Sequence, residues 1–217
     1  MAKYGAMMNL PNGNPFITPD STPFCLYSRQ VVTSSVGNVF QEATASIEID
    51  PSYPLIAFGK ASGVDRGGYP MFCGRLGNRA SVTCRANFRN VHPFTLTAYF
   101  FAIFPQPLPK YGMAIWDAQS KLVLTNESKV LSDLVTIGTV GNQGGININQ
   151  TIGGSYAVSP TVLGATVPMA MRIMTACVFD GANTRFYGAA ASEQSQPPMG
   201  FINHGISITA INTAAYD

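Results

Sequence analysis

Apolar and polar residues alternate along several short segments of the chain, with the period of two that is typical of half-buried strands. The clearest example is residues 81–89, in which Val82, Cys84, Ala86 and Phe88 share one face. Further strands are expected at residues 24–33, 43–49, 55–58, 94–101, 169–178 and 205–212. The pattern predicts an all-β fold, with about seven short strands in each half at the spacing typical of β-sandwiches.

The segments between these strands are rich in glycine, asparagine and proline, which favour turns and loops. We expect a charged loop at residues 59–68, a polar loop at 189–198, and long loops at 138–154 that contain a short strand at 146–149. Helix signals are scarce, and residues 128–134 could form one or two helical turns. Long helices are not expected.

One stretch of the chain occurs twice. Lys110–Thr125 predicts a hairpin of two apolar arms around a polar turn, and Lys3–Thr18 aligns with it without a gap, 107 positions earlier (110 minus 3). Both copies begin Lys-Tyr-Gly. Three further pairs of similar segments follow in the same order: 54–58 with 168–172, 71–74 with 185–188, and 94–99 with 206–211.

This ordered recurrence predicts a tandem duplication, because a repeat of domain size is not a solenoid of short units. The alternative is coincidence among short strand-forming segments. We expect two tandem, internally duplicated β-sandwich modules, residues 1–105 and 106–217, joined by a proline-rich linker at residues 104–109.

Charged residues make up 11% of the 217 residues, against about 25% in ordinary soluble domains. Such a surface is either polar and uncharged or covered by neighbouring subunits. The net charge of +2 provides no strong field to attract nucleic acid. The longest apolar run, from Phe94 to Phe104, is shorter than the roughly 20 residues of a membrane-spanning helix, so membrane insertion is not expected.

The four cysteines are Cys25, Cys73, Cys84 and Cys177, and they form no Cys-x-x-Cys pair. A disulfide framework common to both halves is excluded, because three of the four lie in the first half. Cys73 and Cys84 could meet across a hairpin, but buried thiols are favoured.

Sequence motifs for catalysis are absent. The chain has no nucleophile elbow, no paired-histidine zinc motif and no phosphate-binding loop. Its two histidines, His92 and His204, each precede the last expected strand of a half, which favours a structural role. We therefore predict no enzyme activity, no catalytic residues, no cofactor and no metal site.

A concentration of arginines is the strongest charge feature of the chain. The stretch that holds them contains no acidic residue, and arginine is favoured at protein interfaces because its planar fork makes bidentate hydrogen bonds. An ordinary solvated face is the second interpretation, and nucleic acid a distant third. The candidate interface residues are Arg66, Arg75, Arg79, Arg85 and Arg89, together with the lone tryptophan, Trp116.

The repeated hairpin also carries a resemblance. Its pattern is Tyr111-Gly112, then Ile115-Trp116-Asp117-Ala118, then Ser120-Lys121-Leu122-Val123-Leu124. It resembles the openings of small β-rich proteins from the tail tips and fibres of tailed bacteriophages. In the first copy, Asn9-Leu10 departs from the Trp-Asp form.

The resemblance implies a non-enzymatic structural or attachment component of the virion at the distal tail. Its expected partners are other virion proteins, further copies of itself around the tail axis, and a host-surface receptor. It would be assembled in the host cytoplasm, since Met1-Ala2-Lys3 opens no signal peptide. The alternatives are a capsid decoration or head–tail joining protein, and a carbohydrate-binding module or carbohydrate-active enzyme.

Overall fold

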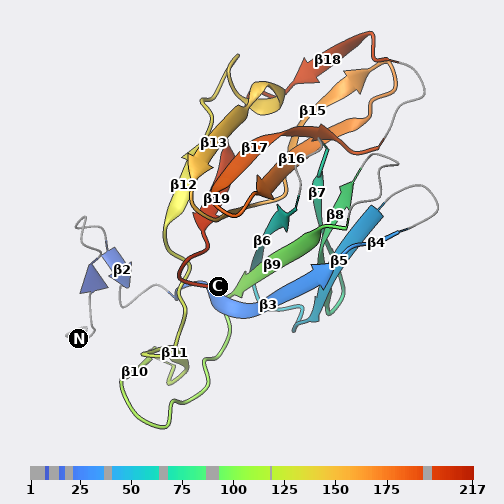
Figure 1. Cartoon of the computed structure of the whole chain (residues 1–217). Coiled ribbons are helices and arrows are strands. Elements are labelled where there is room, and N and C mark those ends of the chain that lie inside the picture. The colour runs from blue at the N-terminus through green and yellow to red at the C-terminus, as the bar shows by residue number, and fades with distance from the viewer. Residues whose placement is uncertain are drawn as a thin grey trace.

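The protein is built almost entirely of β-strands (Figure 1). The computed structural model describes residues 8–9, 15–17, 22–36, 41–63, 68–86, 93–117, 119–192 and 197–217. Within these residues the only helical element is one 3-10 turn, η1 (Gly145–Asn147). The predicted all-β fold class is confirmed.

The largest sheet has 11 strands and contains both halves of the chain. Its main path runs β12-β19-β14-β6-β16-β15-β18, while β3 and β9 branch from β6, and β17 and β13 branch from β16. The strands of the first half are β3 (Cys25–Thr33), β6 (Leu55–Ser62) and β9 (Thr95–Ala102). Those of the second half are β12 (Leu134–Ile137), β13 (Asn149–Gly153), β14 (Tyr156–Val158), β15 (Val162–Val167), β16 (Arg172–Phe179), β17 (Asn183–Ala190), β18 (Gly200–Asn203) and β19 (Ile208–Asn212).

A second sheet of four strands packs against the first. Its order is β4 (Ser35–Val36), β5 (Gln41–Glu48), β8 (Arg79–Ala86) and β7 (Met71–Leu76). Alternate residues of β8, Val82 and Cys84 among them, are fully buried, as the sequence pattern predicts. They join one continuous core with Leu96 of β9 and Phe186 of β17.

Two hairpins lie outside both sheets. They are β1 (Met8–Asn9) with β2 (Pro15–Ile17), and β10 (Ala114–Trp116) with β11 (Leu122–Thr125), each forming a separate two-stranded sheet. In Figure 1 both stand away from the main body of strands. These are the two hairpins that the repeated sequence predicts.

The two halves use the same pairing scheme. In the first half β3 pairs with β9 and β9 with β6, while β5 pairs with β8 and β8 with β7. In the second half β12 pairs with β19 and β19 with β14, while β13 pairs with β17 and β17 with β16. Strands β4, β15 and β18 have no counterpart in this scheme.

The predicted division into two separate modules is not confirmed. Strand β6 of the first half pairs antiparallel with β14 and parallel with β16 of the second, so one sheet crosses the expected boundary. The proline-rich segment 104–109 has no regular structure and leads into the hairpin β10–β11. Residues 1–105 and 106–217 therefore share a sheet and a core.

Several local predictions are wrong. Residues 128–134 form no helix, because Val130 forms a bridge to Cys25 at the start of β3. Ile146 and Asn147 belong to η1, and β13 starts only at Asn149. The expected loop at 59–68 begins later, since β6 continues to Ser62. Gly59 lies inside that strand. Glycine is favoured at this position because a Cβ atom there would come within 3.0 Å of the Val82 side chain of the opposite sheet.

Two of the aligned sequence pairs also fall on strands that do not correspond. The pairing scheme matches β7 with β16, whereas the sequence alignment placed residues 71–74 on 185–188 of β17. It matches β6 with β14, whereas residues 54–58 were aligned with 168–172. The pair 94–99 and 206–211 does fall on corresponding strands, β9 and β19.

Candidate functional site

The described members of the predicted arginine interface lie on the four-stranded sheet. Arg75 of β7 donates to the carbonyl oxygens of Asp50 and Tyr53, both at 2.8 Å, and so fixes the turn that precedes β6. Arg85 of β8 donates to the Glu42 carboxylate of β5 at 2.7 and 2.9 Å. Both guanidinium groups therefore bond within their own chain.

Arg79 begins β8 and is exposed, while Arg66 and Arg89 lie outside the described residues. Arg79 and Arg85 share the outward face of β8, since the residues between them alternate with the buried positions. The described arginines thus share one sheet, where Arg85 is paired with an acidic neighbour. Their role at an interface stays a prediction.

Trp116 lies elsewhere, on a projecting unit that we call the arm, residues 103–130. The turn between its two strands is held by Asp117, whose side chain accepts hydrogen bonds from the amides of Gln119 at 2.9 Å and Lys121 at 2.8 Å. Aspartate commonly forms such turns, because its short side chain can accept hydrogen bonds from backbone amides a few residues further along. Ser120 completes the turn with a positive φ of 61°.

The other end of the arm is closed by Gly112 and Asn126. The Asn126 side-chain oxygen accepts from the amide of Met113 at 3.1 Å, and the Asn126 amide donates to the Met113 carbonyl at 3.1 Å. Gly112 has a φ of 119°, and a side chain at this position would overlap the Asn126 amide group. The Tyr-Gly of the repeated motif therefore has a conformational reason.

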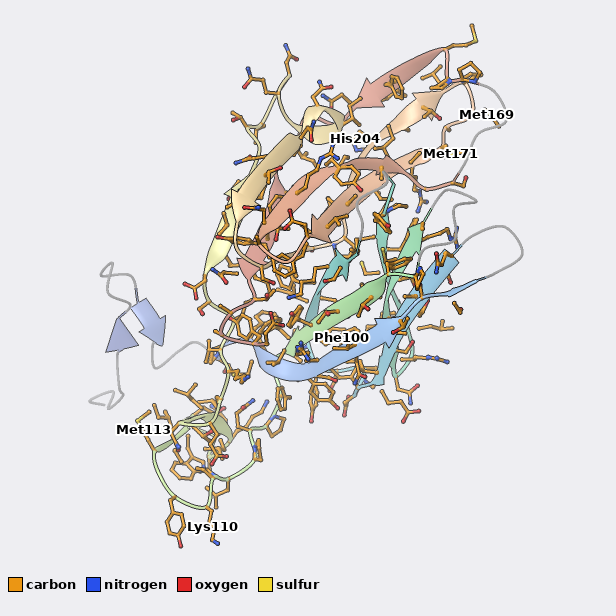
Figure 2. All side chains as sticks on the ribbon, in the orientation of Figure 1. Phe100, Lys110, Met113, Met169, Met171 and His204 are labelled. Carbon is orange, nitrogen blue, oxygen red and sulfur yellow. The ribbon has the colours of Figure 1, made fainter. Side chains whose placement is uncertain are left out.

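Apolar residues of the arm divide into an inner and an outer set. Leu122, Val123 and Leu124 of β11 are buried within it. The outer set is exposed, with exposed fractions of 70% for Leu108, 79% for Tyr111, 43% for Met113 and 52% for Trp116. We call these four residues the arm tip. Figure 2 shows Met113 and Lys110 at the end of the molecule opposite His204.

At the far end of the large sheet, a second apolar set accompanies the edge strand β18. Met199, Phe201 and Ile202 are all more than half exposed. Within the described residues β18 pairs only with β15, so its outer edge carries unpaired backbone groups. Of these two apolar sets, only Trp116 was expected from the sequence, because exposure of an apolar side chain depends on tertiary packing.

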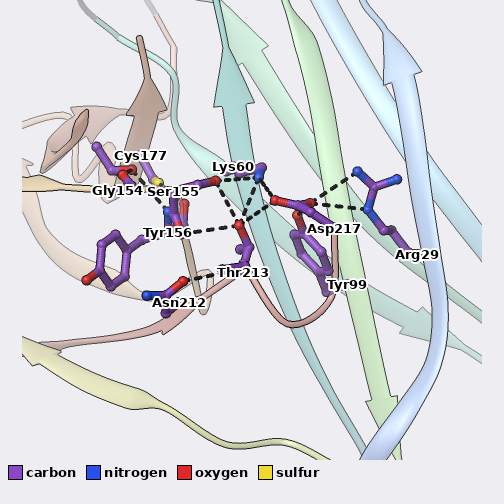
Figure 3. A network of polar contacts seen from close by, with 12 residues as sticks. Arg29, Lys60, Tyr99, Gly154, Ser155, Tyr156, Cys177, Asn212, Thr213 and Asp217 are labelled. Carbon is purple, nitrogen blue, oxygen red and sulfur yellow. Dashed lines mark hydrogen bonds and ion pairs between the residues drawn. The ribbon is translucent and has the colours of Figure 1, made fainter. Parts of the chain in front are cut away.

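A buried polar network crosses the junction of the two halves (Figure 3). Lys60 of β6 is 5% exposed, and its ammonium donates to Ser155 at 2.6 Å, Thr213 at 3.0 Å and Asp217 at 2.8 Å. Thr213 in turn donates to the same oxygen of Asp217 at 2.7 Å. Every donor of the ammonium group thus has an acceptor.

The other carboxylate oxygen of Asp217 accepts from the Tyr99 hydroxyl and from Arg29 at 3.1 Å. Partial burial alone would raise the pKa of Asp217, but the hydrogen bonds from Lys60, Tyr99 and Thr213 outweigh it and hold this pKa well below its usual range. Burial, with the carboxylate beside it, raises the pKa of Tyr99, so its hydroxyl stays protonated as a donor.

This network is suited to holding structure. A general base must be unprotonated and must reach its substrate, whereas Lys60 is buried and paired with an ionised carboxylate. Next to it, Tyr216 is buried against Phe101 and accepts from the Ser132 amide at 2.8 Å. The network and Tyr216 together fasten segment 213–217 to strands of both halves.

Residues 138–150, within the long loops predicted at 138–154, line a shallow hollow with a volume of about 420 Å³. Its lining is polar, with Thr139, Asn142, Gln143, Asn149 and Gln150 among the residues. It contains no aromatic platform. The hollow offers amide groups for hydrogen bonding rather than groups for catalysis.

No metal-ligating group of three His, Cys, Asp or Glu side chains occurs among the described residues. None of the helices in the described part of the chain is long and apolar enough to cross a bilayer. All four cysteines are free, with Cys25, Cys84 and Cys177 buried and Cys73 exposed. No protein-family model matches this chain, and no curated protein or solved structure is significantly similar to it.

Proposed function

We propose that this protein is a non-enzymatic structural component of a larger protein assembly, and that it works by packing against other subunits. The observation that carries this proposal is the arm tip. Leu108, Tyr111, Met113 and Trp116 are all substantially exposed on one projecting unit. Several exposed large apolar side chains within one short segment are typical of a protein contact.

The energetics of the arm favour a partner. Fully burying one large apolar side chain contributes about 1.5–3 kcal/mol. Since the arm tip offers four partly exposed ones, a partner that covered them would gain several kcal/mol, before the entropy cost of association. The tip is rich in aromatic and methionine side chains, which are enriched in the centres of interfaces.

The kind of assembly is suggested by the hairpin motif. The arm contains the Tyr111-Gly112 to Leu124 pattern that resembles tail-tip and fibre proteins of tailed bacteriophages. On this basis the assembly is the distal tail of a virion, and the partners are other virion proteins. A charged fraction of 11% is consistent with a surface partly covered by such neighbours.

The test is incorporation into particles. We expect peptides of this chain in purified particles of the parent phage, detected by mass spectrometry. A double variant, Tyr111→Asp with Trp116→Asp, should fold but be lost from the particles, because it places charge at the contact. Leu76→Asp is the matched control, since Leu76 is 86% exposed at the turn of β7 and β8 on another sheet.

Absence of the protein from particles, or unchanged incorporation of the double variant, would contradict the proposal. Cryo-microscopy of the particle separates a distal tail position from the alternatives at the capsid surface or the head–tail joint. It also identifies the neighbouring proteins.

The hollow at residues 138–150 supports a second candidate function, a carbohydrate-binding module. Amide side chains such as those of Gln143 and Gln150 suit hydroxyl-rich ligands, and a host glycan would be the receptor. Binding on a glycan array that is lost in Gln143→Ala with Gln150→Ala would favour this function. Binding that both changes leave intact would exclude the hollow as its site.

A further inference from the structure

We propose that the arm hairpin β10–β11 of one copy docks against the hairpin β1–β2 of a second copy, so that copies of this chain join head to tail. The proposal names the partner for the assembly role above and rests on that role. It is carried by the backbone of the two hairpins and by the way in which the two halves already pair.

The hairpins repeat one another in register. Met8 pairs with Ile17 and Asn9 with Pro15. Adding the repeat spacing of 107 gives Ile115 with Leu124 and Trp116 with Leu122, and these are the pairs observed in the arm. The register irregularity also falls at the equivalent step, between Met8 and Asn9 and between Ile115 and Trp116. The described strands of the two hairpins therefore pair in the same way.

The remaining parts of the two halves already dock on each other inside one chain. Gly59 of β6 pairs with Ala98 of β9, and Val158 of β14 pairs with Ala210 of β19. Ala98 and Ala210 are equivalent in the aligned strands β9 and β19, so Gly59 and Val158 are equivalent too. These two residues pair directly with each other, antiparallel. A pseudo-two-fold axis thus relates the halves at this point.

The hairpins take no part in that internal pairing. Within the described residues each is a sheet of two strands with no further neighbour. An isolated two-stranded hairpin is marginally stable in water, and its open edges are templates for further strands. A second hairpin of the same shape supplies the missing strands.

The contact inside the chain indicates which hairpins pair between copies: the first hairpin with the second, and not two first or two second hairpins with each other. There, a strand of the first half meets its equivalent from the second half. If the hairpins follow the same rule between copies, each chain has one donor hairpin and one acceptor hairpin. Such a heterologous contact generates a closed ring or an open filament, and a ring is what an assembly around a tail axis requires.

Two equivalent proline substitutions test the proposal in the full chain. Met8→Pro disrupts β1–β2, and Ile115→Pro disrupts β10–β11 at the position 107 residues later. Proline lacks a backbone N–H group, so it interrupts strand pairing on whichever face the replaced side chain lies. Circular dichroism checks that the sheets remain folded, and Leu76→Asp is again the control.

Size-exclusion chromatography with light scattering measures the mass. We expect the wild type and the control to form oligomers, and each proline variant alone to run at 23.1 kDa. An equal mixture of the two variants should give a dimer of 46.2 kDa (twice 23.1) and nothing larger, because only one intact pair of hairpins remains.

Three results would overturn the inference. They are a monomeric wild type, proline variants that remain as large as the wild type, and a single variant that dimerises by itself, which would mean like-with-like pairing. The particle-incorporation experiment is scored separately. A monomeric wild-type protein that is still incorporated into particles would therefore reject this contact and leave the assembly role in place.

Discussion

Replacing Lys60 by methionine tests whether the buried network holds the two halves together. The change keeps the length and apolar stem of the side chain but removes the ammonium group. Ser155, Thr213 and Asp217 each lose a donor at 2.6–3.0 Å. Contacts of the ammonium with the rings of Tyr99 and Phe179, at 5.6 and 5.5 Å, are lost as well.

The expected loss in the free energy of unfolding is about 2–3 kcal/mol. Removing one partner of a buried ion pair typically costs 3–5 kcal/mol, because the other charge is left uncompensated. The lower figure applies here, since the side chain of Asp217 is 33% exposed and keeps Arg29 as a partner. Solvent and Arg29 therefore replace part of what Lys60 supplied.

The effect should depend on pH in a defined direction. The folded pKa of Asp217 lies below its ordinary value, so its pairing stabilises the fold above the unfolded pKa of about 3.9 and is lost as pH falls toward the folded pKa. Urea unfolding followed by circular dichroism at pH 7 and near pH 3 measures this. The difference between wild type and Lys60→Met should shrink in acid.

Asp217→Asn provides the second arm of a double-mutant cycle. Since both changes break the same contact, the sum of the two single-variant losses in unfolding free energy should exceed the loss in the double variant. A Lys60→Met protein as stable as the wild type at pH 7, or strictly additive costs, would refute the role assigned to the network.

Three further changes test other parts of the structure. Gly112→Ala should destabilise the arm by about 1–3 kcal/mol through its positive φ and its overlap with Asn126, seen as faster hydrogen exchange confined to the arm; unchanged exchange there would contradict the closure described. Cys73 should react first with a thiol reagent, because burial raises the pKa of all four thiols but only Cys73 is exposed to the reagent. A Cys73→Ser protein that still reacts fast would contradict this. Tyr216→Phe should cost about 1–2 kcal/mol in thermal or urea unfolding, because the partly buried Ser132 amide loses its acceptor, and an unchanged midpoint would argue against it.

Much of the fold could be predicted because strand patterns are local. The alternation in residues 81–89 placed β8, and the repeated sequence placed both hairpins. Pairing between distant strands has no such local signal. Nothing at Gly59 or Val158 indicates that they meet, and the contact follows only once the halves are folded together.

The candidate sites were harder to predict than the strands. The arginine stretch is conspicuous in sequence, yet Arg75 and Arg85 bond to groups of their own chain that lie 22 to 43 positions away. Lys60 lies in a segment whose glycines and charges predict a loop, and lysine rarely occurs in a buried strand. Its partners Ser155 and Asp217 come from the other half, and no local pattern identifies them.

The two hairpins share a strand register but differ in sequence, and this difference bears on how copies would associate. Trp116 is replaced by Asn9 at the equivalent position, and Leu122 by Pro15. Proline at an edge removes a backbone donor, which disfavours pairing of that strand with its own kind. Two identical hairpins would permit contacts of either type, first with first or first with second. Hairpins that differ at the paired positions can favour one type over the other, since specificity is a difference between affinities. Asn9→Trp together with Pro15→Leu gives the first hairpin the paired residues of the second, so we expect the Ile115→Pro protein that carries both changes no longer to dimerise when it is mixed with the Met8→Pro protein. A dimer in that mixture would mean that the choice of partner is set outside these paired positions.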